Sequence, residues 1–297
     1  MALSILWMST DVASIVLPIL TSLFVFFGGS ISNTYFSYLK KKKQIEESRE
    51  IVIQWTDMVI EVVKEQIKVI DSLAKEIRQS KELLPKAFHF MKNMAERLGD
   101  MTADRMESIF LINCKVPCRV EDKRRQNAYN IIGQYVYLSL MEDEIQRAYD
   151  TYNHACNSIV SDWNRILKKT QSDIEALAKL TEPANIGIRD NLCSTVSHYL
   201  MNRDQDDSFE KVYSGLIQPL DETVKKCKSE FPEVSSGEAV YIDSQEMILI
   251  YRQWEANNIG YSKMFIAMSQ NLQRSIDSLK RSTTYFEKNT KVKVRYW

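Results

Sequence analysis

Hydrophobic residues dominate the start of the chain without interruption and only later become periodic. From Val12 to Leu39 no residue is charged, and the next four residues are all lysines. A helix of this length can cross the roughly 30 Å of hydrocarbon in a bilayer. Its positive charge follows the apolar run, whereas a secretory signal carries positive charge before it. The pattern therefore predicts an uncleaved transmembrane helix over 12–39.

The lysines also predict the orientation of this helix. Lys40, Lys41, Lys42 and Lys43 stand at its end, and basic flanks remain on the cytoplasmic side of a membrane. We therefore expect a single-pass protein of the bacterial inner (plasma) membrane, with a short tail (1–11) outside and the bulk of the chain in the cytoplasm. The lipid membrane is its first expected partner, with the four lysines at the membrane surface.

One face of the predicted span carries mostly small or hydroxylated residues. They recur at alternating spacings of four and three, and they are Ser14, Pro18, Thr21, Val25, Gly28 and Ser32. Small faces let transmembrane helices approach closely, and apolar area alone gives them no drive to associate in lipid. The face is typical of an oligomer or pore. It is also compatible with a lone anchor in which the small residues are incidental.

The same spacing continues past the membrane into a predicted helical stem over 40–82. Its seam consists of Ile53, Ile60, Val63, Ile67, Ile70 and Ile77. β-Branched residues at both core positions of a coiled coil favour three or more strands, which predicts a homo-oligomer of at least three subunits. A second apolar flank, which includes Val59 and Leu73, widens the face as in a helix buried within its own bundle. Packing on a neighbouring chain and packing within the chain both remain open.

Composition favours helices throughout the rest of the chain. The sequence of 297 residues has only 8 Gly and 6 Pro, against 44% hydrophobic and 26% charged residues. Scarce helix breakers and long periodic segments are typical of helical proteins. The predicted fold is therefore all-α: one N-terminal transmembrane helix continues into a long coiled-coil-like stem, followed by a cytoplasmic all-helical domain over 83–297.

Prolines and polar residues suggest where the helices of this domain begin and end. We expect short helices over 86–98 and 191–201, a helix of about forty residues ending near Leu180, and a kink at Pro219. A loop over 232–243 should precede the last long helix, with Asp243 and Glu246 forming a capping box at its start. Asp207 and Glu210 fit another capping box. The alternating tail over 292–297 could pair as a strand with 239–242.

The net charge and the cysteines limit the kinds of binding site and metal site that the sequence predicts. The net charge is zero, which excludes a strong overall field for nucleic acid or anionic surfaces. The five cysteines are odd in number and scattered, as expected for reduced cytosolic thiols. Cys114 and Cys118 lack a nearby histidine or a second cysteine pair and so form a poor zinc site. We expect no metal and no cofactor.

One short motif, Arg147 with His154, could indicate an enzymatic reaction. Arg147 and His154 match the loose Arg-x6-His spacing of the HEPN-type ribonucleases, which are all-helical proteins. The resemblance covers eight residues and implies that this pair would cut RNA at a dimer cleft. Ala148 departs from the polar residue that usually follows the arginine in that family. Both side chains fall opposite the apolar stripe of their helix, so solvated polar residues are the simpler interpretation.

Three functions remain open on the sequence. In layout the chain resembles the membrane-tethered helical effectors of bacterial antiphage and CRISPR-accessory systems, which implies a pore-forming or membrane-perturbing effector controlled by its cytoplasmic domain. The alternatives are a passive tethered scaffold or adaptor, and the tethered ribonuclease. A cytoplasmic protein or an RNA-containing complex is a further candidate partner. An enzymatic activity is the less favoured reading.

Overall fold

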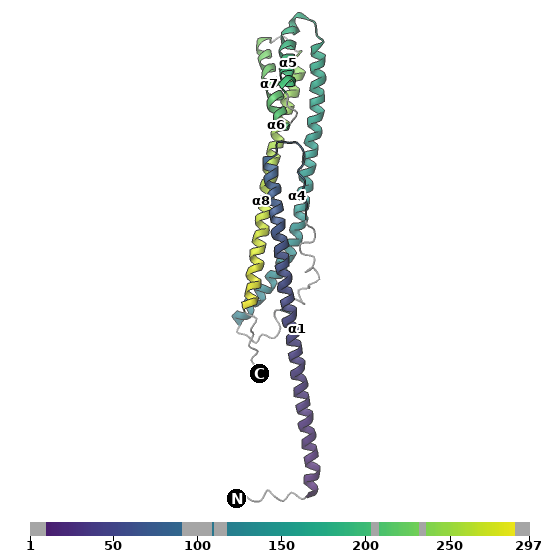
Figure 1. Cartoon of the computed structure of the whole chain (residues 1–297), viewed down its shortest axis with the longest axis vertical. Coiled ribbons are helices and arrows are strands. Elements are labelled where there is room, and N and C mark those ends of the chain that lie inside the picture. Colours follow the sequence, from purple (N-terminus) through teal and green to yellow (C-terminus); the bar gives the residue numbers. More distant parts are fainter. Residues whose placement is uncertain (1–9, 91–108, 110–117, 203–207, 232–235, 289–297) are drawn as a thin grey trace. The chain divides into compact units, whose positions relative to one another are not determined.

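The computed structural model describes residues 10–90, 109, 118–202, 208–231 and 236–288. In these residues the chain forms helices and no strands, which confirms the all-α class (Figure 1). The helices in chain order are α1 (Thr10–Gln79), α4 (Cys118–Ala178), α5 (Pro183–Asn202), α6 (Phe209–Val212), the π-helical turn η1 (Tyr213–Ile217), α7 (Gln218–Glu230) and α8 (Glu238–Lys288).

The chain divides into two compact units. Unit 1 comprises 1–58, 98–132 and 281–297, and unit 2 comprises 59–97 and 133–280. In unit 1, Arg49 Nη2 donates a hydrogen bond to the backbone oxygen of Ile109 at 3.2 Å. Asn130 Nδ2 donates to Ser282 Oγ at 2.7 Å, which fastens α4 to α8 in this unit. The buried apolar residues there include Val52, Ile131 and Phe286.

Unit 2 holds two hydrophobic clusters. The first, which we call the aromatic cluster, is formed by Ile159, Trp163, Ile166, Phe209, Ile217, Met247, Tyr251 and Trp254. The second, the aliphatic cluster, is formed by Leu177, Ile188, Leu192, Leu220, Val224, Cys227 and Val240. Helices α4 and α8 contribute residues to both clusters. The π turn contributes to the aromatic cluster, and α7 contributes to the aliphatic cluster. Helices α5 and α7 pack directly against each other beside α8 (Figure 1).

The expected kink near Pro219 takes the form of a widened turn just before the proline. The amide of Gln218 donates to the carbonyl of Tyr213, five residues back, instead of four. Proline has no amide hydrogen, and its ring clashes with the carbonyl four residues earlier. A π-helical turn relieves this clash because it displaces that carbonyl. Gly215, in the same turn, leaves room for the Tyr199 ring, which a Cβ would approach to 3.2 Å.

Several helix boundaries differ from the sequence expectation. Helix α4 begins at Cys118. Helix α5 begins already at Pro183, because proline is tolerated in the first turn, where no amide donor is needed. Residues 86–90 are not helical, and 91–98 lie outside the described residues. The cap of α6 is Ser208, whose Oγ accepts from the Lys211 amide at 3.4 Å; Asp207 lies outside the described residues. The tail over 292–297 lies outside them as well, and its expected strand partner, 239–242, is helical and belongs to α8.

Helix α8 begins earlier than the predicted loop over 232–243 allows. Its first residue is Glu238, and the amide of Tyr241 donates to the carbonyl of Gly237 at 3.0 Å. A Cβ on residue 237 would meet Ile188 Cγ2 at 3.3 Å, so glycine permits this close approach. Asp243 therefore lies inside the helix and is fully buried, instead of capping its start.

Candidate functional sites

Large apolar side chains are exposed along the N-terminal part of α1. The most exposed are Phe24, Val25, Phe26, Ile31 and Phe36, of which Phe24 is 79% exposed. No described part of the chain covers them, and monomeric soluble proteins rarely expose contiguous apolar patches of this kind. Among the described residues, no helix is long and apolar enough to cross a membrane.

The predicted small-residue face lies on the same exposed part of α1. Pro18, Thr21, Val25, Gly28 and Ser32 are all exposed, and the side chain of Ser14 lies outside the described part. A Cβ added at Gly28 would meet nothing within 4 Å. The face is therefore open to contact from outside the chain.

The lysines at the end of this segment are partly engaged by acidic residues one turn later. Lys42 Nζ lies 3.7 Å from Glu46, and Lys43 Nζ lies 3.7 Å from Glu47. Both pairs are exposed, and such i,i+4 pairs contribute only about 0.3–0.5 kcal/mol each. Lys40 is exposed, and the side chain of Lys41 is outside the described residues. Lys40, Lys42 and Lys43 thus remain accessible for contact with an anionic surface.

The predicted stem seam is covered by the chain itself. Ile60, Val63, Ile70 and Ile77 are at most 2% exposed, while Ile53 and Ile67 are half-buried. Ser262 Oγ on α8 donates to the backbone oxygen of Ala74 on α1 at 2.8 Å, so α8 covers this part of the seam in unit 2. Of the two arrangements open on the sequence, the described chain has the one in which the seam packs internally from Ile60 onward.

Arg147 and His154 both lie exposed on α4. Arg147 Nε donates to the backbone oxygen of Asp143, one turn earlier on its own helix, at 3.2 Å. The tyrosines of the neighbouring apolar stripe point into the bundle instead: Tyr149 Oη donates to the backbone oxygen of Lys86 at 3.1 Å, and Tyr152 is buried. Among the described residues of this helix, no contact brings the Arg147 and His154 side chains together in one site.

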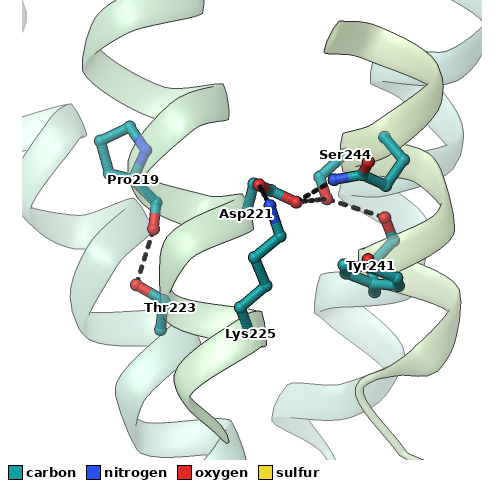
Figure 2. Close-up of polar contacts among 7 residues, drawn as sticks. Pro219, Asp221, Thr223, Lys225, Tyr241 and Ser244 are labelled. Atoms are coloured by element: carbon teal, nitrogen blue, oxygen red, sulfur yellow. Dashed lines mark hydrogen bonds and ion pairs between the residues drawn. The ribbon is translucent and has the colours of Figure 1, made fainter. Parts of the chain in front are cut away.

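Sequence reasoning missed a buried carboxylate on α7. Asp221 is 5% exposed, and its Oδ1 accepts a hydrogen bond from Gln245 Nε2 on α8 (Figure 2). Ser244 Oγ lies 3.3 Å from the same oxygen and donates to the Tyr241 carbonyl at 2.8 Å. Lys225 Nζ binds Asp221 Oδ2 at 2.6 Å, and this hydrogen bond raises the pKa of Lys225. The arrangement fastens α7 to α8.

A second buried carboxylate fastens α8 to α4. Asp243 is fully buried, and its Oδ1 accepts from Lys169 Nζ, whose pKa this hydrogen bond raises. Asp173 stands one turn after Lys169 on α4 and interacts with Asp243. Burial, followed by the contact with Asp243, raises the pKa of Asp173. Asp243 lies five residues after the start of α8. The sequence did not reveal this early start, so it gave no sign that Asp243 would be buried.

Other chemistry is sparse in the described part of the chain. No group of three or more histidine, cysteine or acidic side chains could hold a metal ion there. Cys156, Cys193 and Cys227 are free thiols, and burial raises the pKa of both Cys156 and Cys227, which makes them poor nucleophiles. Cys114 lies outside the described residues, as does the side chain of Cys118.

The aromatic cluster resembles a packed core more than a ligand site. The rings of Tyr213 and Tyr251 stack with centroids 3.6 Å apart, and Phe209 packs edge-on against Trp163 at 4.5 Å. Burial is the main cause that raises the pKa of Tyr251 to about 12. A comparison with family models, curated proteins and solved structures finds no match for this chain.

Proposed function

We propose that this chain is a membrane-tethered helical protein of the bacterial inner membrane, in which segment 12–39 anchors the helical units at the cytoplasmic face as an adaptor. The observation that carries the proposal is the row of exposed phenylalanine and aliphatic side chains on α1, which ends at the lysines. Lipid would cover the apolar side chains, and the lysines would meet the headgroups. The proposal draws on the whole uncharged stretch, which begins at Val12, ahead of the described side chains of α1.

An adaptor fits the internal packing of the seam. Ile60, Val63, Ile70 and Ile77 are covered by their own chain, so these residues are not left for a shared stem. What the chain offers to other molecules is then the anchor and the outer surface of the bundle. An adaptor needs no communication between the bilayer and the bundle. An unrelated uncharged span in place of 12–39 should therefore preserve its cellular role.

The anchor is tested by extraction of the full chain from membranes with alkaline carbonate. We expect the wild-type chain to stay in the membrane fraction and a double variant, F24D with F27D, to become extractable, because charged groups at the centre of a span cost roughly 2.5–3.5 kcal/mol each. The control is L249D, which places one such charge at an exposed apolar position of α8. Extraction of the wild-type chain itself would overturn the proposal.

A second candidate function is a self-associating, membrane-perturbing effector. The observation that favours it is the open small-residue face, because Gly28 has nothing within 4 Å of an added Cβ. A G28L substitution should leave the single chain undisturbed yet block close helix approach in the bilayer. If the effector is correct, the wild-type chain in detergent has the mass of a defined oligomer and makes cells permeable to a small dye. G28L should then lose both properties, whereas F27L on the opposite side should keep them.

A further inference from the structure

Asp173 and Asp243 each keep one buried oxygen without a donor. Asp173 Oδ2 and Asp243 Oδ2 are both inaccessible to solvent and accept no conventional hydrogen bond. The two carboxyls nevertheless contact each other across α4 and α8. Two ionised carboxylates present only acceptors to one another, so the contact has no hydrogen atom unless one carboxyl is protonated. Buried polar groups left in this state destabilise the fold.

We propose that Asp173 and Asp243 share one proton, and that this proton acts as a pH-sensitive clasp between α4 and α8. With the proton in place, one carboxyl donates to the other and both orphaned oxygens are satisfied. Asp243 is the acceptor of the pair, because its Oδ1 already binds the Lys169 ammonium. Asp173 is therefore the carboxyl that holds the proton.

The charged groups around the pair support this division. On α4, Lys169 faces both carboxyls, and on α8, Glu246 also acts on Lys169. On α7, Asp221 is held by Lys225 and by Gln245, so its charge is already compensated. Among the described residues, Lys169 is thus the cation that acts on the pair. One ammonium offsets one of the two carboxylates, which leaves the second carboxyl to be neutralised by a proton.

The direction of the pH dependence follows from the raised pKa of Asp173. Ionisation of this group costs the folded state more than the unfolded state, where the ordinary value is 3.8. The clasp therefore contributes its full stability below that value and loses it as the pH rises through the higher pKa of the folded state. Between the two values the ratio of folded to unfolded chain should fall by up to about tenfold for each pH unit.

The test uses the full chain in detergent and the variant D173N. An asparagine amide donates to Asp243 without titrating, so it imitates the protonated clasp at every pH. We expect wild-type thermal stability to fall as the pH rises through the pKa of the folded Asp173, and D173N to lose that slope and to exceed the wild type at about pH 8. The control D150N changes an exposed carboxyl of the same helix, which accepts from Gln146 at 2.9 Å, and should keep the wild-type profile.

Infrared spectroscopy tests directly whether Asp173 is protonated, which a purely structural role of Asp173 would not require. In a difference spectrum between the wild type and D173N at a pH below the pKa of the folded Asp173, we expect the carbonyl stretch of a protonated carboxylic acid, and we expect this band to disappear on further alkalinisation. Parallel stability profiles of the wild type and D173N would overturn the proposal. A difference spectrum without the carboxylic acid band would overturn it equally.

Discussion

The hydroxyl of Ser262 on α8 donates a hydrogen bond to the backbone oxygen of Ala74 on α1, and both residues are 1% exposed. A donor from α8 thus enters the apolar seam of α1, where a coiled-coil partner from another chain would have to insert its own side chains. The seam in unit 2 is a core of the chain itself.

Ile70 lies at the centre of this seam and is fully buried. The substitution I70A should lower the free energy of unfolding by about 2–5 kcal/mol, because it leaves a cavity in the core. The midpoint of chemical unfolding should be the same at two protein concentrations that differ tenfold, since the seam needs no second chain. The control V62A, at a position 38% exposed, should cost far less. A midpoint that rises with concentration would instead indicate a shared stem.

Two glycines within helices should respond in opposite directions to alanine. At Gly187 on α5 a Cβ would lie 2.9 Å from Phe231 Cζ, a distance that forces the ring to move. At Gly260 on α8 a Cβ would meet nothing within 4 Å. We expect G260A to stabilise the chain by up to about 1 kcal/mol through helix propensity, and G187A to destabilise it by about 1–3 kcal/mol through overpacking. Thermal unfolding followed by circular dichroism measures both; equal shifts would contradict the packing around Gly187.

The Asp221 contacts should contribute measurably to stability. The substitution D221A removes the acceptor of the Gln245 amide and the partner of Lys225, and we expect a loss of about 1–3 kcal/mol. D150A, at an exposed position of α4, should change stability by less than about 0.5 kcal/mol. Unfolding in urea compares the two. Similar small losses would mean that the buried contacts of Asp221 do not hold α7 to α8.

His154 should be dispensable for folding and for any reaction with RNA. It is exposed on α4, and its neighbour Arg147 is engaged with its own helix. We expect H154A to unfold within about 0.5 kcal/mol of the wild type. We also expect that neither protein cleaves single-stranded RNA. Cleavage by the wild type that is lost in H154A would establish the ribonuclease that the Arg-x6-His spacing suggests.

The sequence was most informative where long periodic patterns recur. The seam residues Ile60 to Ile77 lie in the long helix α1, and the helix predicted to end near Leu180 corresponds to α4, which ends at Ala178. Hydrophobic periodicity reports that a face is buried but not which molecule covers it, so packing within the chain and between chains looked alike. The burial of the seam residues and the position of Ser262 against Ala74 distinguish them.

The buried carboxylates escaped prediction for a different reason. Asp243 with Glu246 has the spacing of a capping box, and aspartate is a preferred residue at the start of a helix. The actual start depends on the close approach of Gly237 to Ile188, which is a tertiary contact. A boundary set by such a contact cannot be found from local spacing. The five-residue shift it caused concealed both Asp243 and its partners.

The widened turn at Tyr213–Ile217 has a geometric consequence for the two clusters of unit 2. Phe209 and Leu220 are eleven positions apart, and an uninterrupted α-helix would point them in nearly the same direction. The extra residue of a π-helical turn rotates everything after it by about 100°. Phe209 lies in the aromatic cluster, and Leu220 lies in the aliphatic one. The turn thus sets the rotation of α7 about its own axis. Deletion of a single residue from it would turn Leu220, Val224 and Cys227 away from the aliphatic cluster that they fill.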